Sequence, residues 1–168
     1  MHVHKLTITG FRGAKLLPLE LHDRLNVFFG TNGSGKSSIL DASAILLSWF
    51  VNRVKHESSS GRPLQETDIC NGEAFANLDI TCNFRGSYFS WNLAKTRKGY
   101  SKRDAVSILL STTLVAKLVQ SEITKSNGST NLPLIAYYPV NRAVLDIPLR
   151  IKERHSFDLL SAYSDSLT

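Results

Sequence analysis

The segment from Gly30 to Ser37 constrains this chain more than any other, because it fits the pattern G-x-x-x-x-G-K-[S/T] at every fixed position. Glycines let the backbone curl until successive N–H groups point inward, where a side chain would block an approaching ligand. A helix after such a loop adds its own unpaired N–H groups and the positive end of its dipole. The pattern therefore predicts a cradle for the phosphates of a nucleoside triphosphate.

The side chains of the loop predict how the nucleotide, most simply ATP with Mg²⁺, is held. Lys36 supplies a mobile positive charge to the β- and γ-phosphates. The Ser37 hydroxyl is the expected Mg²⁺ ligand, and the Ser38 hydroxyl can donate to the α-phosphate. The predicted nucleotide-binding residues of the loop are Gly30, Thr31, Asn32, Gly33, Ser34, Gly35, Lys36, Ser37 and Ser38.

The segments around the loop support this interpretation. Residues 25–29 form a nearly unbroken apolar run, which predicts a strand buried on both faces. After the loop, apolar residues recur at three- and four-residue spacing, which predicts a helix from about Gly35 to about Val54.

Alternating apolar and polar residues predict further strands at 3–9 and 16–21, joined by a turn at 10–13. A hairpin with one apolar face is predicted over 74–95. A second helix is expected to begin at Asp104 as its cap and to run through Ser121, within a helical insertion of about 104–124. Residues 132–140 end in the pattern of a core strand.

Composition excludes several classes of protein. The chain has 168 residues, 42% of them hydrophobic and 20% charged, which is typical of a soluble globular domain. Neither a membrane-spanning run nor a signal peptide is predicted, so we expect a cytoplasmic protein without membrane contact. Cys70 and Cys82 lie in no metal-ligand pattern, and the net charge of +6 is compatible with a polyanionic partner without identifying one.

The runs at 6–13 and 25–42 resemble the amino-terminal lobe of the ABC-type ATPases, in particular the RecF and structural-maintenance-of-chromosomes group. This resemblance implies an α/β P-loop NTPase fold: an ABC-type ATPase head lobe with mixed or antiparallel strands packed on the P-loop helix. It also implies head-to-head dimerisation, or a higher oligomer, across ATP. Arg12 matches the turn arginine of the group, which lies near the α-phosphate or base of the nucleotide, although Gly10 replaces the group's usual Asn.

Residues 132–142 show a second, narrower resemblance, to PtuA-like ATPases of the Septu and retron anti-phage systems. There the ATPase is paired with an HNH nuclease, so the resemblance implies a nuclease partner regulated by nucleotide. Asn141 or Arg142 would occupy the place of the glutamine that contacts Mg²⁺ and the attacking water in ABC ATPases, with an ordinary turn as the alternative.

Two motifs that ATP hydrolysis needs in this group are missing from the sequence. The apolar run 143–146 ends in Asp146 but is followed by Ile-Pro rather than Glu, and no serine-glycine signature like L-S-G-G-Q occurs. We therefore expect residues 1–168 to be the amino-terminal part of an ABC-type ATPase domain. The Walker B strand and the signature would belong to a second lobe, and this part alone would hydrolyse ATP very slowly.

Other functions stay open at this stage. The chain could be the head of a DNA-repair or chromosome-organising ATPase, or a scaffold that binds ATP without hydrolysing it. A small P-loop kinase fits the length, but two strands precede the loop and no arginine-bearing lid is evident. Finally, a basic cluster predicts either a solvated surface or a DNA or RNA contact; it comprises Lys95, Arg97, Lys98, Lys102 and Arg103.

Overall fold

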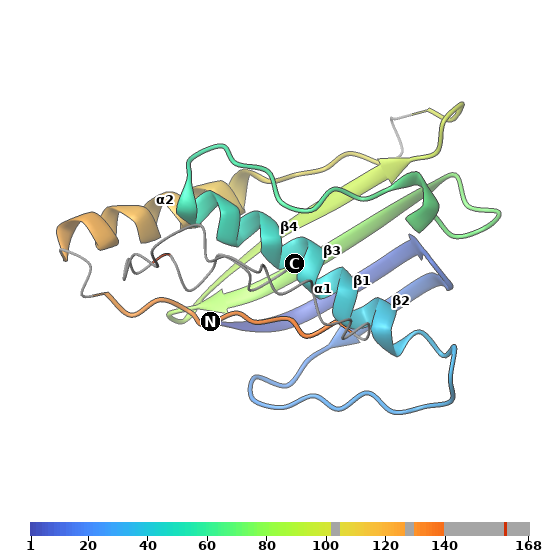
Figure 1. Cartoon of the computed structure of the whole chain (residues 1–168), viewed down its shortest axis with the longest axis horizontal. Coiled ribbons are helices and arrows are strands. Elements are labelled where there is room, and N and C mark those ends of the chain that lie inside the picture. The colour runs from blue at the N-terminus through green and yellow to red at the C-terminus, as the bar shows by residue number, and fades with distance from the viewer. Residues whose placement is uncertain (102–104, 127–129, 140–159, 161–168) are drawn as a thin grey trace, which may run out of the picture.

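The computed structural model describes residues 1–101, 105–126, 130–139 and 160. Figure 1 shows a sheet with the long helix α1 lying over one of its faces. The elements are β1 (His2–Phe11), β2 (Ala14–Glu20), α1 (Lys36–Lys55), the short 3-10 helix η1 (Glu66–Asp68), β3 (Phe75–Phe84), β4 (Ser87–Thr96) and α2 (Leu110–Lys125). This α/β arrangement agrees with the predicted fold class.

The sheet is antiparallel, with the strand order β2-β1-β3-β4. Two hairpins build it, and the long connection through α1 brings β3 alongside β1. The β3–β4 turn is formed by Arg85 and Gly86, both with positive φ. Two such residues give a turn whose twist matches that of the flanking strands.

The core lies between the inner face of the sheet and α1. Leu6 and Ile8 of β1 are fully buried there, as the alternation in the sequence predicts. The indole N–H of Trp91 in β4 donates to the carbonyl of Leu46 in α1, at 3.1 Å. This bond and the apolar packing fix the helix on the sheet. The other large core side chains are Phe11, Ile45, Phe50, Val51, Val54, Leu78, Ile80 and Val119.

Both edges of the sheet are protected. Directly after β2, the N–H of Leu21 donates to the carbonyl of His4. Backbone groups at alternate positions of β2 therefore face β1, and the nitrogen of Pro18 faces outward. Proline suits an edge strand in that orientation. At the other edge, Asn92 of β4 exchanges two backbone bonds with Ile108.

Three predictions about secondary structure are wrong. Residues 25–29 form no strand, and Leu25, Val27 and Phe29 are exposed, because no described segment offers them a strand to pair with. The second helix begins at Leu110 rather than at Asp104: residue 104 lies outside the described residues, and 106–108 are taken up by the edge of β4. Residues 132–139 are likewise not a strand.

Gly10 and Gly13 flank the β1–β2 turn and offer a matched pair of substitutions. Gly10 has φ +59°, and a Cβ there would lie 2.2 Å from the carbonyl oxygen of Phe75, whereas a Cβ at Gly13 would meet nothing within 4 Å. We expect Gly10→Ala to lower the free energy of unfolding by about 1–3 kcal/mol or more, and Gly13→Ala to change it by less than about 0.5 kcal/mol. Urea unfolding followed by circular dichroism measures both, and equal effects would contradict the described turn.

Candidate nucleotide-binding site

The loop from Gly30 to Ser37 leads directly into α1, as its sequence predicts. Gly33 and Gly35 have φ of +84° and +91°, values that favour glycine over any other residue. A Cβ on either would find no atom within 4 Å, so the space in front of them is open. Backbone conformation and open space together make this loop a concave surface on which a phosphate can approach the main chain.

The start of α1 leaves backbone donors available. The first helical bond runs from the N–H of Ile39 to the carbonyl of Gly35, at 3.1 Å. The N–H groups of Lys36, Ser37 and Ser38 precede it and therefore have no acceptor within the helix. In the described chain no side chain caps this end and no acidic residue lies in its first turn. An anion is thus favoured here by both the free donors and the helix dipole.

Lys36 closes the loop from the other side. Its ammonium group donates to the carbonyl oxygens of Gly30 at 2.8 Å and Thr31 at 2.7 Å, and approaches the Ser34 hydroxyl at 3.4 Å. These contacts fold the side chain back over the loop that it follows. The positive charge is therefore held against the loop at Gly30 and Thr31.

A hollow of about 130 Å³ lies between the loop and the β1–β2 hairpin. Gly13 and Ala14 line it from the hairpin, and Gly33, Gly35 and Ser38 line it from the loop and helix. The turn that contains Arg12 is thus next to the phosphate loop.

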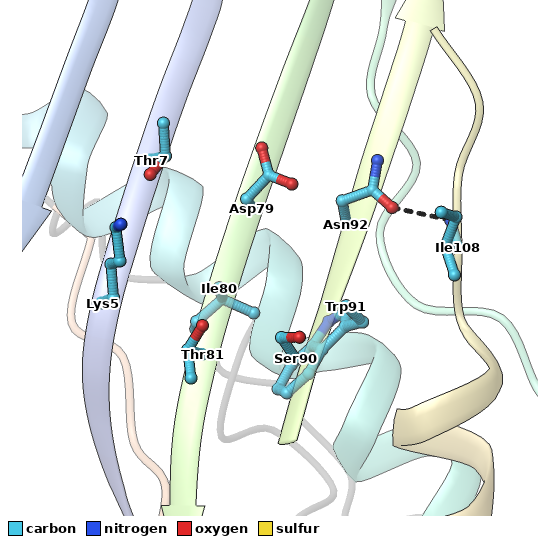
Figure 2. Close-up of a pocket in the computed structure, with 9 residues that line it drawn as sticks. All are labelled: Lys5, Thr7, Asp79, Ile80, Thr81, Ser90, Trp91, Asn92 and Ile108. Atoms are coloured by element: carbon cyan, nitrogen blue, oxygen red, sulfur yellow. Dashed lines mark hydrogen bonds between the residues drawn. The ribbon is translucent and has the colours of Figure 1, made fainter. Parts of the chain in front are cut away.

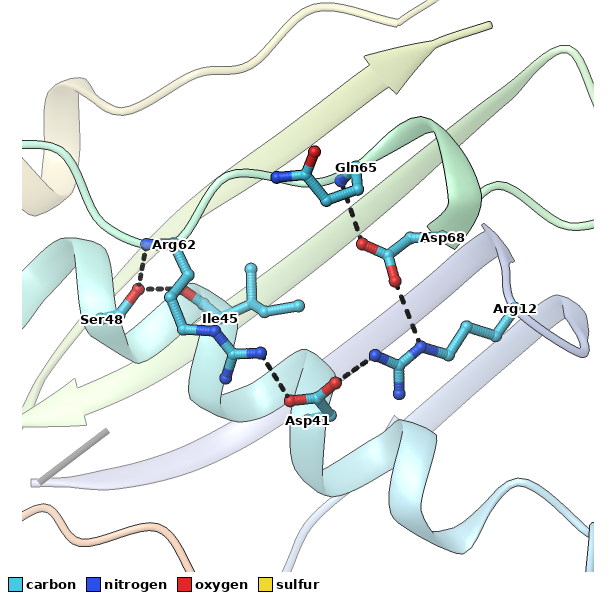
Figure 3. Close-up of polar contacts among 7 residues, drawn as sticks. All are labelled: Arg12, Asp41, Ile45, Ser48, Arg62, Gln65 and Asp68. Atoms are coloured by element: carbon cyan, nitrogen blue, oxygen red, sulfur yellow. Dashed lines mark hydrogen bonds and ion pairs between the residues drawn. The ribbon is translucent and has the colours of Figure 1, made fainter. Parts of the chain in front are cut away.

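Arg12 itself is held by two carboxylates (Figure 3). Its Nη2 contacts Asp41 of α1 and its Nε donates to Asp68 of η1 at 3.3 Å. The backbone N–H of Arg12 also donates to the carbonyl of Asp68, at 2.7 Å. The nucleotide contact predicted for Arg12 remains a prediction, but the structure shows what orients the side chain.

Asp41 is the centre of this cluster, and the sequence did not single it out as a site residue. It is buried, with 7% of the residue exposed, and its second oxygen accepts from Nη2 of Arg62 at 3.0 Å. The Tyr137 hydroxyl is a further hydrogen-bond partner of this carboxylate. Burial, and next the charge of Asp41, raise the pKa of Tyr137 above its ordinary value, so the hydroxyl keeps its proton. The available signal was an acidic residue four positions after Ser37, on a helix that is otherwise apolar there.

The predicted basic cluster is only partly an open surface. Lys95 and Lys98 are exposed, while Lys102 and Arg103 lie outside the described residues. Arg97 instead points back into the chain, where its guanidinium donates to three carbonyl oxygens at 3.1 to 3.4 Å. Those carbonyls belong to Glu73, Ile69 and Cys70. Arg97 thus stabilises the segment before β3, and the nucleic-acid contact stays a prediction for the remaining lysines.

Two other predictions concern residues for which the structure adds little or nothing. Asn141 and Arg142, the predicted contact to Mg²⁺ and water, lie outside the described residues. Cys70 and Cys82 are buried free thiols, and burial raises the pKa of Cys82 to about 12, so it stays protonated and unreactive.

Among the described residues, no three acidic, His or Cys side chains gather into a metal site. In the same part of the chain, no helix is both long enough and apolar enough to cross a bilayer.

A larger hollow, of about 390 Å³, lies on the outer face of the sheet and shares no residue with the loop. Figure 2 shows polar side chains from three strands around it, among them Lys5, Asp79 and Asn92. The Asn77 amide donates to Asp79 at 2.6 Å and accepts from Asn92 at 2.8 Å. Burial raises the pKa of the Asp79 carboxyl. These bonds satisfy the polar groups of an open sheet face, and nothing here points to a phosphate.

The fold and the loop define the chain as a P-loop ATPase domain of the α/β class. Comparison with known proteins gives the family: the sequence profile described as "AAA domain" (AAA_23) matches residues 5–168, and the chain belongs to that family. Together with the relatives below, this makes it an ABC-type ATPase domain of the RecF and structural-maintenance-of-chromosomes group, and the resemblance seen in the sequence is confirmed.

Three curated relatives illustrate this membership. The chain is 28% identical over its whole length to the retron Ec83 probable ATPase of Escherichia coli, covering 32% of that protein. It is 29% identical to the retron Vc95 probable ATPase of Vibrio cholerae serotype O1 biovar El Tor, over 70% of this chain and 23% of that one. The DNA replication and repair protein RecF of Corynebacterium jeikeium is 24% identical, over 98% of this chain and 40% of that one. The chain thus spans between about a quarter and two fifths of these relatives.

Replacing Arg97 tests whether it is a structural residue. We expect Arg97→Ala to lower the free energy of unfolding by about 1.5–3 kcal/mol, because three carbonyls lose a charged donor. The exposed Lys95→Ala is the matched control and should cost less than about 0.5 kcal/mol. Chemical denaturation measures both. A negligible loss for Arg97→Ala would mean that these bonds do not contribute to stability.

Asp79 gives a prediction about pH. Because folding raises its pKa, the carboxyl favours the native state fully only below its ordinary pKa near 3.8, and this contribution is lost as the pH rises through the native value. Asp79→Asn should therefore raise the thermal midpoint at pH 7, and the gain should vanish as the pH falls below about 4. Scanning calorimetry over this range checks it, with the exposed Asp23→Asn as control. A gain that does not depend on pH would contradict the assigned cause.

Proposed function

We propose that this chain carries the ATP-binding part of an ATPase subunit, and that the presence or absence of nucleotide in the loop at 30–37 regulates the subunit. The observation that carries the proposal is the cradle itself: Gly33 and Gly35 open the loop, the helix supplies unpaired donors, and the Lys36 ammonium closes the mouth. No acidic residue of the described chain competes for the first turn of α1. A triphosphate fits this charge pattern better than a neutral ligand does.

Magnesium belongs to this proposal. The chain has no metal cluster of its own among the described residues, so the ion would arrive with the nucleotide. Ser37, exposed at the start of α1, is the residue that would contact it. In such sites the ion supplies charge to the β- and γ-phosphates, while the protein fixes their position.

We further propose that residues 1–168 are the amino-terminal part of a larger ATPase domain, with Walker B and signature motifs supplied elsewhere. Support comes from the exposed apolar segments beside α1. Leu25 and Phe29 are 73% and 92% exposed, and Leu134 and Tyr138 are 85% and 81% exposed, although both segments are mostly apolar, like buried strands. Apolar side chains at this density are normally covered. Strands from the rest of the domain would pair with these segments and cover them.

For the biological role, the proposal is a cytoplasmic subunit of a bacterial anti-phage system that dimerises, or assembles further, across ATP and thereby controls a nuclease of the HNH type. The two retron ATPases among its relatives support this choice, as does the resemblance at 132–142. A DNA-repair or chromosome-organising head is the second candidate, supported by RecF among the relatives.

Lys36→Ala tests the nucleotide site. Removal of the ammonium group should weaken ATP binding at least about tenfold, because a charge-assisted contact to phosphate is lost. Titration calorimetry in buffer with Mg²⁺ measures the affinity. The matched control is Lys98→Ala, which removes one positive charge from an exposed position away from the loop and should leave ATP affinity unchanged. Equal affinities of Lys36→Ala and the native chain would contradict the assigned site.

The two candidate roles differ in what accompanies the protein. We expect the tagged protein, expressed from its natural operon, to co-purify with an HNH nuclease subunit, and the nuclease to respond to ATP. Recovery without a nuclease, together with long coiled-coil sequence in the same chain and ATP-dependent DNA binding, would favour the second candidate instead. Size-exclusion chromatography with and without ATP tests the proposed dimerisation in either case.

A further inference from the structure

Asp41 is a buried carboxylate that touches three separate parts of the chain. It lies on α1, one helical turn beyond Ser37, and its side chain is only 11% exposed. A carboxylate this far from solvent is stable only when charged partners and hydrogen bonds replace its water. Asp41 has such partners in Arg12, Arg62 and Tyr137.

Arg62, one of the two arginine partners of Asp41, is held in place by contacts with α1. The N–H of Arg62 donates to the Ser48 hydroxyl at 2.8 Å, and the Trp49 indole donates to the carbonyl of Arg62 at 2.9 Å. Between them, Gly61 lies so close to α1 that a Cβ would be 2.5 Å from the backbone nitrogen of Trp49. Because the backbone of Arg62 is fixed against α1, its guanidinium binds one oxygen of Asp41 from a defined position.

This arrangement leaves the other oxygen for Arg12. Two nitrogens of the guanidinium are thus engaged, Nη2 by Asp41 and Nε by Asp68. The third nitrogen, Nη1, makes no hydrogen bond within the described part of the chain. The side chain remains 36% exposed, and the turn that carries it lines the same hollow as Gly33 and Gly35. A guanidinium with a free nitrogen, carried by a turn that lines an anion site, is suited to contact that anion.

We propose that Asp41 is a positioning residue of the nucleotide site, which orients the Arg12 guanidinium toward bound nucleotide and ties it to the segment of Tyr137. This inference rests on the proposed function, since it concerns the affinity for the same ligand. Asp41 does not touch the nucleotide. It acts because it is rigidly joined, through α1, to the loop that binds the phosphates, so that the loop and Arg12 keep one relative placement.

Tyr137 gives the cluster its third attachment. Its hydroxyl bonds to the Asp41 carboxylate, while the neighbouring Tyr138 is 81% exposed. The segment 130–139 is thereby joined to the helix that begins at the phosphate loop. Arg12 and Tyr137 thus share Asp41 as a neighbour.

A double-mutant cycle on ATP affinity tests the proposal in the full-length natural chain. Arg12→Ala should weaken ATP binding about tenfold, the loss of one charge-assisted contact, and Asp41→Asn should weaken it at least about threefold. The double variant should bind no more weakly than Arg12→Ala alone, because Asp41 acts only through Arg12. Glu122→Gln, which breaks the ion pair between Arg85 and α2, is the matched control and should leave affinity unchanged.

The outcomes separate this proposal from a merely structural role. The proposal would be overturned if Asp41→Asn lowered the melting temperature but left ATP affinity at the native value. It would also be overturned if the double variant lost ATP affinity by the full product of the two single losses. If Asp41→Asn does not fold, Tyr137→Phe decides in its place: it removes one hydroxyl, and about a twofold loss of ATP affinity that disappears in the Arg12→Ala background is expected, whereas unchanged affinity would overturn the proposal. Failure of the native chain to bind ATP would instead contradict the proposed function.

Discussion

The burial of α1 against the inner face of the antiparallel sheet is the interaction on which the rest of the structure depends. Ile45, Leu46 and Phe50 are removed from water there, and the Trp91 indole bonds to the helix backbone. Because the phosphate loop is the direct continuation of α1, the packing that stabilises the core also fixes where the open backbone donors of Lys36 to Ser38 stand. The nucleotide site is thus an exposed end of a buried helix.

A second, polar set of contacts completes what the apolar packing begins. The hairpin turn at Arg12, the helix at Asp41 and the connection at Arg62 and Asp68 come from distant parts of the sequence. Two acidic and two basic side chains meet there, so their charges balance. Apolar packing holds the helix on the sheet without strong directional preference, whereas these pairs have defined geometry and set the turn beside the loop.

Sequence patterns predicted best the elements whose partners lie close by in the chain. The alternation in β1, β2 and the β3–β4 hairpin, and the periodicity of α1, all match the structure. Apolar runs misled at 25–29 and 132–139, where apolar residues remain exposed because the described chain gives them no strand to pair with. The predicted start at Asp104 failed because residues 106–108 pair with the edge of β4.

The sequence by itself determined that this chain has a phosphate-binding loop, the glycines that shape it, the helix that follows and the family to which it belongs. Each of these depends on residues close together in the chain, where spacing alone dictates backbone conformation. Only the tertiary structure decided that Asp41 is shared by Arg12, Arg62 and Tyr137, and that Arg97 faces inward rather than forming part of a basic surface. Those roles arise from contacts between segments tens of residues apart, and no local pattern of residue types encodes which long side chain meets which partner.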